Sequence, residues 1–385
     1  MQQFSRILLV LGLLAIILTA CQPAASAPTP DMSIIMTQAV ETAMAGIVTP
    51  TPLPTETPLP TVTLPPRTPP ALPPVYTTSV LNPLDTPHTY EADTCQYLQN
   101  KWNPNNAAPG TVVMVVMFHS ITKDATASGI QITASDQRKL MNDLHEQGFQ
   151  AITTEQLADF MEHNAFIPPR SVLLVVDDRH FAEYFNTHFR PFYEEFGWPV
   201  VNAYIAKDER PDLWAENAAL SAEGWVDYQA HGVVHNINMD DSSSDEYLAS
   251  ELQGAILNFQ KYFNKTPIAI IWPGGNFGVR PVQFAREFGY RLGFTVNPRG
   301  PFMYNWVPQG DEKDPQRPYY IPEGPAGDSL MTLPRYWDVD ARNHLDEVRS
   351  IGNDAAAYAE QNRATELEYY DIVCAPTYGP IPTAP

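Results

Sequence analysis

The chain has 385 residues, of which 44% are hydrophobic and 17% charged, so it can build a sizeable core and is not a wholly disordered protein. Its 44 acidic and 23 basic residues give a formal net charge of −21. Such a surface repels phosphate backbones, which excludes a general nucleic-acid binder. Three cysteines are too few for a disulfide scaffold or a cysteine zinc cluster.

The first 21 residues have the pattern of a secretion signal. Arg6 precedes the apolar run Ile7–Leu18, which is shorter than the ~20 residues that a membrane-spanning helix needs. Small residues then lead to Cys21, as in the bacterial lipobox, where the cysteine sulfur receives a diacylglycerol. We therefore predict a lipoprotein signal peptide over residues 1–21 and an extracytoplasmic protein that is anchored to the cell membrane through lipidated Cys21. The alternative is an ordinary signal peptide with an incidental cysteine.

Residues 22–89 form a Pro/Thr-rich segment that is almost without charge. This composition favours extended polyproline II conformation, and it cannot bury enough apolar surface to offset the entropy of ordering. We predict a disordered, flexible linker there, a single catalytic domain over residues 90–376, and a C-terminal tail over residues 377–385. We expect a monomer.

Strand and helix patterns alternate within the predicted domain. Repeated β/α units of this spacing predict an α/β fold, an irregular (β/α) barrel, with an open doubly wound sheet as the alternative. A capping box of Thr153 and Gln156 predicts the start of a helix that runs through His163. The other expected helices are Gln137–Gln147, Tyr184–Phe196 and Asp245–Phe263, and the expected strands are Val112–Phe118, Ala151–Thr153, Ser171–Val176, Val200–Ile205, Trp225–Ala230, Ile268–Trp272, Leu292–Val296 and Leu330–Leu333.

Cys95 and Cys374 lie near the two ends of the predicted domain. In an oxidising compartment they could form a disulfide, which in the chain-entropy model would stabilise the domain by roughly 5 kcal/mol. The alternative is two unpaired thiols.

Three predicted strands end in polar or glycine-rich segments. Asp177 and Asp178 point in different directions after their strand, so one can bind a cation while the other takes a proton. His231 and His235 have the i, i+4 spacing that places two imidazoles on one face of a helical turn, where they can bind one divalent metal. The third segment, Trp272–Gly278, has glycines that let backbone amides approach a ligand. Taken singly, these features could be a solvated turn, two unrelated surface histidines and a loop.

Together and in this order, the three segments resemble the polysaccharide deacetylase family, carbohydrate esterase family four. The first motif of that family reads Thr-Phe-Asp-Asp-Gly, the second His-Ser/Thr-x-x-His, and the third Arg-Pro-Pro-Tyr-Gly or Tyr-Pro-x-Gly. Residues 116–121, which include His119, resemble the first strand of the family, and Leu333-Pro334-Arg335 resembles a late strand of its extracellular branch.

The resemblance implies a metal-dependent amide hydrolase. Asp178, His231 and His235 would hold a divalent metal, most often Zn²⁺, with Co²⁺, Ni²⁺ or Mn²⁺ as alternatives. Asp177 would be the general base, and the backbone amide of Gly274 would stabilise the oxyanion. Acetate would be released from an N-acetylglucosamine-type polymer of the cell surface or cell wall.

The sequence departs from the family pattern at several positions. Arg179 replaces the glycine of the first motif, and the arginine of the third motif is absent, so that Arg335 is the candidate to orient Asp177. The late histidine that supplies the general acid has no clear counterpart. The candidates for that role are His119, His180 and His344.

Substrate contacts are expected from His119, Trp272, Asn276 and Trp306. Trp306 belongs to the aromatic-rich segment Pro301–Asp328, whose rings could stack on sugars or pack on the barrel. Two other functions remain possible from the sequence. The first is a carbohydrate-binding protein with an impaired catalytic site, which Arg179 suggests. The second is a glycoside hydrolase, which leaves the histidine pair without a role.

Overall fold

The apolar run Val112–Phe118 forms a fully buried strand, β2, in a computed structural model that describes Met36, Ala43 and residues 67–125, 131–234 and 237–383. The predicted signal peptide, Cys21, most of the predicted linker and His235 lie outside the described residues. The remaining strands are β1 Asp85–His88, β3 Gln150–Ala151, β4 Arg170–Asp177, β5 Val200–Tyr204, β6 Val226–Ala230, β7 Ala269–Ile271, β8 Leu292–Phe294, β9 Val307–Gly310 and β10 Tyr336–Trp337.

The helices fall largely where sequence periodicity places them. A capping box of Thr153 and Gln156 starts α5, as predicted. The expected helix Tyr184–Phe196 is instead two helices that meet at Phe189, because Pro191 has no N–H to donate to the Thr187 carbonyl and cannot continue the first helix. The α-helices are α3 Thr94–Trp102, α4 Ala134–Glu146, α5 Thr154–His163, α6 Ala182–His188, α7 Arg190–Phe196, α8 Pro211–Ala222, α9 Asp245–Phe263, α10 Val279–Glu287, α11 Asp338–Ala341, α12 Leu345–Tyr369 and α13 Ala375–Tyr378.

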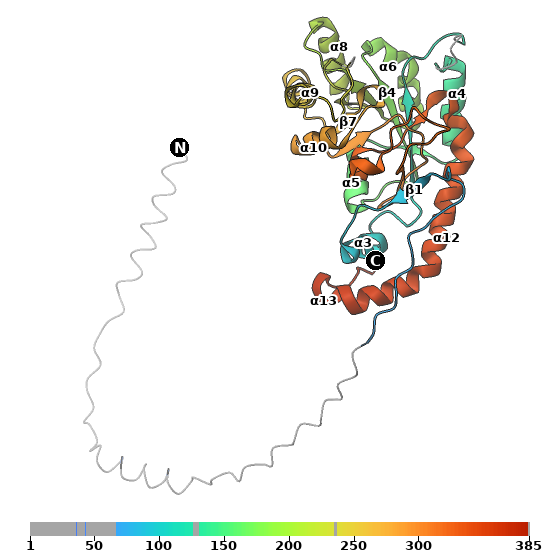
Figure 1. The fold of residues 1–385 in the computed structure, drawn as a ribbon, viewed down its shortest axis with the longest axis vertical. Helices are drawn as coiled ribbons and strands as arrows, with labels where there is room; N and C mark the ends of the chain where they lie inside the picture. Colours follow the sequence, from blue (N-terminus) through green and yellow to red (C-terminus); the bar gives the residue numbers. More distant parts are fainter. Residues whose placement is uncertain (1–35, 37–42, 44–66, 126–130, 235–236, 384–385) are drawn as a thin grey trace, which may run out of the picture. The chain divides into compact units, whose positions relative to one another are not determined.

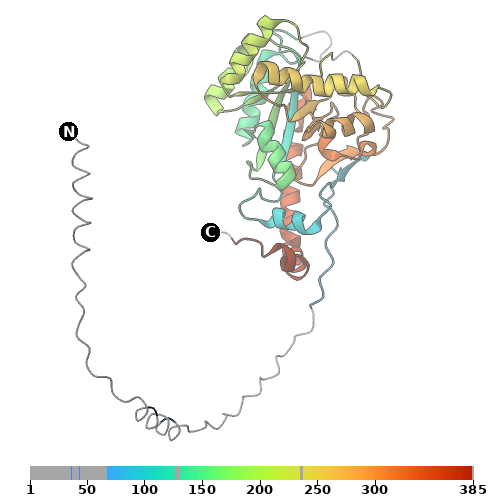
Figure 2. The same ribbon diagram turned by 90° about the vertical axis from the view of Figure 1, so that its left-hand side faces the viewer.

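The main sheet is parallel and has the strand order β10-β2-β4-β5-β6-β7-β8, with β3 paired to β4. Its central strands read as continuous apolar runs, which is what burial on both faces requires. The sheet curls into a half-barrel with helices around it, as Figures 1 and 2 show. The predicted barrel class is therefore confirmed.

A short segment, residues 333–337, bridges the two edges of the curled sheet, and we call it the seam. Its first residue, Leu333, pairs with Phe294 in β8, and its last two residues form β10, which pairs with β2. The strand predicted at Leu330–Leu333 is wrong over most of its length, because residues 329–331 form a 3₁₀ turn, η3 Ser329–Met331. Arg335 lies in the middle of the seam and is fully buried.

The domain begins earlier than residue 90. Residues 85–88 form β1, which pairs antiparallel with β9, and Tyr76 packs against Trp306 and Tyr358. Farther upstream, Arg67 forms ion pairs with Glu368 and Asp371. The linker prediction is thus wrong over residues 67–89, because this proline-rich stretch finds apolar and charged partners on the domain.

The N- and C-terminal ends of the domain are joined covalently. Cys95 in α3 and Cys374 form a disulfide that spans 279 residues of sequence, with Cα atoms 5.2 Å apart. Helix α12 runs from the barrel toward α3 (Figures 1 and 2). The predicted pairing is confirmed. No helix in the described part of the chain is long and apolar enough to cross a membrane.

Candidate active site

The three strand ends singled out in the sequence lie along one edge of the sheet. Asp177 ends β4, His231 directly follows β6, and Pro273 begins the 3₁₀ turn η1 Pro273–Gly275 after β7. In the strand order, β5 alone separates β4 from β6, and β7 adjoins β6. Because the strands are parallel, their carboxyl ends meet at this edge, which we call the catalytic end of the barrel.

Asp177 is buried and is held by Arg335. The two guanidinium NH groups donate to the two carboxylate oxygens at 2.6 and 2.9 Å, while the Nε of Arg335 donates to the Thr295 carbonyl at 2.6 Å. Burial raises the pKa of Asp177, but the positive charges of Arg335, His231 and His119 outweigh it and bring the pKa to about 2. Asp177 is therefore a carboxylate at any ordinary pH, and the contact expected from Arg335 is present.

His119 also lies close to Asp177. Its Nε2 is 3.7 Å from the Asp177 Oδ2, and its ring stacks on Trp337 with 5.5 Å between centroids. The side chain keeps 34% of its surface exposed, whereas Asp177 keeps 2%. His119 can thus carry protons between the buried carboxylate and solvent or a ligand.

Asp178 and His231 face each other. The His231 Nδ1 is 2.7 Å from the Ile271 carbonyl, and since a carbonyl only accepts, this nitrogen carries a proton. In a neutral imidazole the lone pair is then on Nε2, which lies 3.8 Å from the Asp178 Oδ1. Asp178 has a φ of +75°, so its side chain diverges from that of Asp177. The two neighbouring carboxylates thereby serve two different partners.

The donor atoms of Asp178 and His231 fit a divalent metal. One zinc–nitrogen and one zinc–oxygen bond together measure about 4.0–4.3 Å, so two atoms 3.8 Å apart can reach a single ion. A metal ligand that donates its other ring nitrogen to a backbone carbonyl is also typical of such sites. Within the described residues no cluster of three His, Cys, Asp or Glu side chains forms, and the third predicted ligand, His235, lies outside them.

Arg179, which replaces a glycine of the family pattern, is held by the loop after β5. Its Nε donates to the Ile205 carbonyl at 3.1 Å, and its guanidinium also contacts the Lys207 carbonyl and Glu209. These contacts orient the cation toward the β5–α8 connection.

His180 braces the turn that carries the two carboxylates. Its Nε2 lies 3.0 Å from the Asp177 carbonyl, and its ring stacks on Tyr184 at 4.0 Å. Burial lowers the pKa of His180 and favours the neutral ring. These contacts favour a positioning role for His180.

The third segment presents an exposed backbone. Gly274 has a φ of +59°, and a Cβ at this position would lie 3.1 Å from the Asn276 Nδ2. Asn276 itself donates to the Gly274 carbonyl and to the Asn238 Oδ1, so it fixes the turn. Trp272 is fully buried and donates to the Met331 carbonyl at 2.7 Å, so the prediction that it contacts substrate is wrong.

Two other predicted residues are engaged in contacts of their own. Trp306 is 4% exposed and donates to the Tyr76 carbonyl, near the bridge between Phe302 and Val113 at the start of β2. Its predicted contact with substrate at the active site is therefore wrong. His344 holds Asp340 and Glu347 with its two ring nitrogens at 3.0 Å each, which occupies both of them.

Sequence reasoning missed Asp338, which follows the seam. The residue is 3% exposed, and burial together with the charge of Asp177 raises its pKa to about 7. The charge of Asp338 also acts on Tyr184, whose pKa is raised mainly by burial. The available signal was the position of Asp338 three residues after Arg335, directly after a strand.

The chain was compared with known protein families, curated proteins and solved structures. The model of the family described as polysaccharide deacetylase matches residues 167–293, a span that includes Asp177, Asp178, His231 and Gly274. The search of curated proteins found no significant match.

Several solved structures are similar to the chain. One is a deacetylase from Streptococcus pyogenes in complex with acetate, at 16% identity and a TM-score of 0.49, which covers 63% of this chain and 99% of its own. Another is IcaB from Ammonifex degensii, at 14% identity and a TM-score of 0.45, which covers 63% and 98%. A polysaccharide deacetylase from Bacillus cereus shares 19% identity at a TM-score of 0.43 and covers 58% and 64%.

Proposed function

We propose that the chain is a metal-dependent hydrolase that removes N-acetyl groups from an N-acetylglucosamine-type polysaccharide, and the match of the polysaccharide deacetylase family model to residues 167–293 supports this. The observation that supports this most directly is the buried Asp177 carboxylate, which pairs with Arg335 and lies close to the partly exposed His119. The proposal includes an extracytoplasmic location and a lipid anchor at Cys21.

Asp178, His231 and His235 would hold the divalent metal, with Zn²⁺ as the first candidate and Co²⁺, Ni²⁺ or Mn²⁺ as alternatives. When bound, such an ion polarises a carbonyl and lowers the pKa of water. The Ile271 carbonyl supports this assignment, because it fixes the His231 tautomer that directs a lone pair toward Asp178.

The residues of the chain divide the proton transfers of amide hydrolysis. The Asp177 carboxylate, which Arg335 orients, accepts the proton of the attacking water as its oxygen bonds to the acetyl carbon. Because the pKa of Asp177 is low, the carboxylate does not keep this proton but passes it to the neighbouring His119. His119, 3.7 Å away, delivers a proton to the sugar nitrogen as the C–N bond breaks. The products are acetate and a sugar amine.

The Gly274 amide is the proposed donor to the carbonyl oxygen that becomes negative in the transition state. It occupies the start of a 3₁₀ turn, where no carbonyl of the same helix can accept it. Removing one such donor typically costs about 3–4 kcal/mol of barrier. Arg179 does not oppose the enzymatic assignment, because its guanidinium is held by the carbonyls of Ile205 and Lys207.

The test is acetate release from N-acetylglucosamine oligomers by the full chain, with zinc or cobalt added and with a chelator as the comparison. We expect Asp177→Asn to lower kcat by at least ~100-fold, in line with the usual contribution of a general base. We expect His119→Gln to lower kcat similarly, because the sugar nitrogen would then lack its proton donor.

A matched control is Asp346→Asn, which changes an exposed carboxylate that pairs with Arg349 on the surface. Its rate should equal that of the wild type. Equal, background acetate release from the wild type and from Asp177→Asn, together with retained glycan binding, would instead support a binding protein. New reducing ends without acetate would support a glycoside hydrolase.

A further inference from the structure

A cavity of about 280 Å³ lies at the end of the barrel opposite the catalytic end, and we call it the rear cavity. Its walls come from residues 72–76, α3, residues 108–111 before β2, residues 303–306 and α12. Thr111, which lines it, directly precedes β2, whereas His119 directly follows that strand. The seven residues of β2 span about 23 Å, so the rear cavity is well separated from Asp177.

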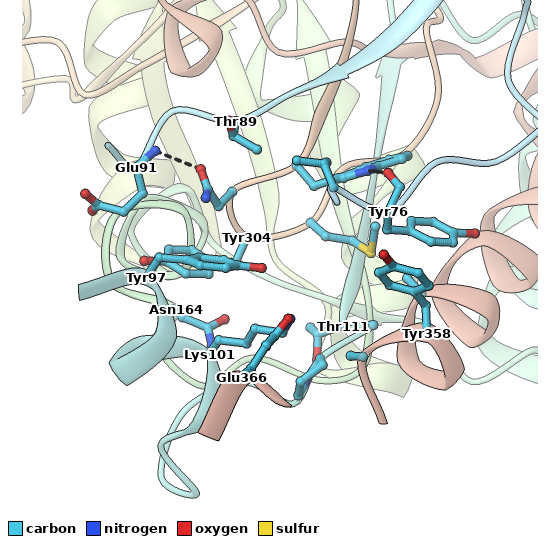
Figure 3. Close-up of a pocket in the computed structure, with 18 of the residues that line it drawn as sticks. Tyr76, Thr89, Glu91, Tyr97, Lys101, Thr111, Asn164, Tyr304, Tyr358 and Glu366 are labelled. Carbon is cyan, nitrogen blue, oxygen red and sulfur yellow. Dashed lines mark hydrogen bonds and ion pairs between the residues drawn. The ribbon is translucent and has the colours of Figure 1, made fainter. Parts of the chain in front are cut away.

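Aromatic rings stand on two sides of the rear cavity (Figure 3). On one side Tyr97 and Tyr304 stack on each other, with 6.0 Å between centroids. On the other side Tyr76 packs against Tyr358 at 5.6 Å and against Trp306 at 5.9 Å. Rings on both sides suit a flat ligand with apolar faces.

The floor of the rear cavity is polar. The Lys101 ammonium donates to the Glu366 carboxylate at 2.8 Å, and the pair is almost buried, with exposed side-chain fractions of 12% and 5%. The Trp102 indole donates to the same carboxylate. Because the ammonium has three N–H groups, Lys101 can also donate to a ligand. Figure 3 shows Lys101, Glu366, Thr111 and Asn164 together beneath the rings.

Thr111 gives an independent sign of a ligand. The residue is 3% exposed, and its hydroxyl has no hydrogen-bond partner among the described residues. A buried hydroxyl without a partner costs free energy, so such groups normally find one in protein, water or ligand. The hydroxyl oxygen itself is almost inaccessible, so the Thr111 side chain must turn toward the rear cavity to reach a ligand hydroxyl there.

We propose that the rear cavity is a second saccharide-binding site that takes one or two neutral sugar rings. A sugar ring presents apolar C–H faces to the aromatic walls and hydroxyls to the polar floor. A purely apolar ligand would leave the Thr111 hydroxyl unpartnered. The site does not favour an anion, because Lys101 is the only lysine or arginine among the lining residues and they also include Glu91 and Glu366. The volume is just below the ~300 Å³ at which pockets for larger ligands begin.

The site does not depend on catalysis, and the experiment keeps the two apart. The full chain is titrated calorimetrically with the N-acetylglucosamine disaccharide, and crystals soaked in it locate the sugar. Thr111→Val removes the hydroxyl at nearly constant volume and should weaken binding by 3- to 10-fold, the usual worth of one hydrogen bond. Ala359→Phe, which fills the cavity from α12, should abolish binding at this site.

Two further variants serve as controls. Thr266→Val makes the same substitution at an exposed position outside the cavity and should leave the affinity unchanged. Asp177→Asn changes the catalytic end and should leave binding in the rear cavity intact. The proposal is overturned if the disaccharide does not bind, or if Asp177→Asn alone weakens binding. Binding in the rear cavity without acetate release would support this site and contradict the proposed activity.

Discussion

Replacing Arg335 with methionine should destabilise the protein mainly through the charge that it leaves behind. Both partners of the Arg335–Asp177 pair are buried, at 0% and 2% side-chain exposure. Breaking a buried pair by removing one partner typically costs about 3–5 kcal/mol, because the other charge loses its compensation. The pKa of Asp177, about 2, is nearly two units below its usual 3.8, which corresponds to about 2.5 kcal/mol of net favourable interaction with the carboxylate.

The cost should depend on pH with a definite sign. In the wild type, the depressed pKa of Asp177 contributes stability above pH 4 that is lost as the pH falls toward 2. In Arg335→Met, burial would raise the pKa of Asp177 above its unfolded value. The penalty should then be largest near pH 7.5 and should shrink as the pH falls and the carboxyl group takes up a proton.

Urea denaturation at pH 7.5 and pH 4.5 measures these differences. The double variant Arg335→Met/Asp177→Asn should be more stable than the sum of the two single changes predicts, because neither charge remains. Arg349→Met is the matched control, since it breaks an exposed pair with Asp346 and should cost at most about 1 kcal/mol. A cost below 1 kcal/mol for Arg335→Met, equal at both pH values, would refute the reasoning.

Three further changes test other features. Asp338→Asn should stabilise the fold by up to about 4 kcal/mol at pH 8 and hardly at all at pH 4. The reason is that the pKa of Asp338 is raised to about 7, so the buried carboxylate destabilises the fold only as the pH rises above 4. Equal shifts in the melting temperature at both pH values would contradict this. Gly274→Ala should lower the stability by about 1 kcal/mol, because alanine is strained at a φ of +59°. It should lower kcat/KM for acetate release by at least 10-fold. An unchanged rate would show that Gly274 is not part of the site. Cys95→Ser/Cys374→Ser should lower the free energy of unfolding in urea by about 5 kcal/mol, while the folded fraction keeps its rate of acetate release. A loss below 1 kcal/mol would contradict the loop-closure argument.

The strands and the catalytic end were predictable because they rest on local patterns. The apolar run of β2 needs burial on both faces, and carboxyl ends of parallel strands meet at one edge. This was enough to bring Asp177, Asp178 and His231 together.

The remainder depends on contacts between distant residues. Trp306 and Trp272 read as sugar-stacking rings in the sequence, but each is buried and satisfies its N–H at a carbonyl far along the chain. The proline-rich residues 67–89 lack the pattern of a folded segment and are held by partners more than 200 residues away, such as Trp306 and Tyr358. The burial of Asp338 likewise depends on how the seam closes the sheet, which no local pattern encodes.

The disulfide determines how the domain carries mechanical load. Tension on the chain before residue 67 would first break the ion pairs of Arg67 and then unzip β1 from β9, since these contacts are non-covalent. Peeling would stop at Cys95, where the bond to Cys374 passes part of the force to the C-terminal end of the domain. The barrel would then bear the force through both α3 and α12. The catalytic end could therefore stay assembled while residues 67–88 detach from the domain.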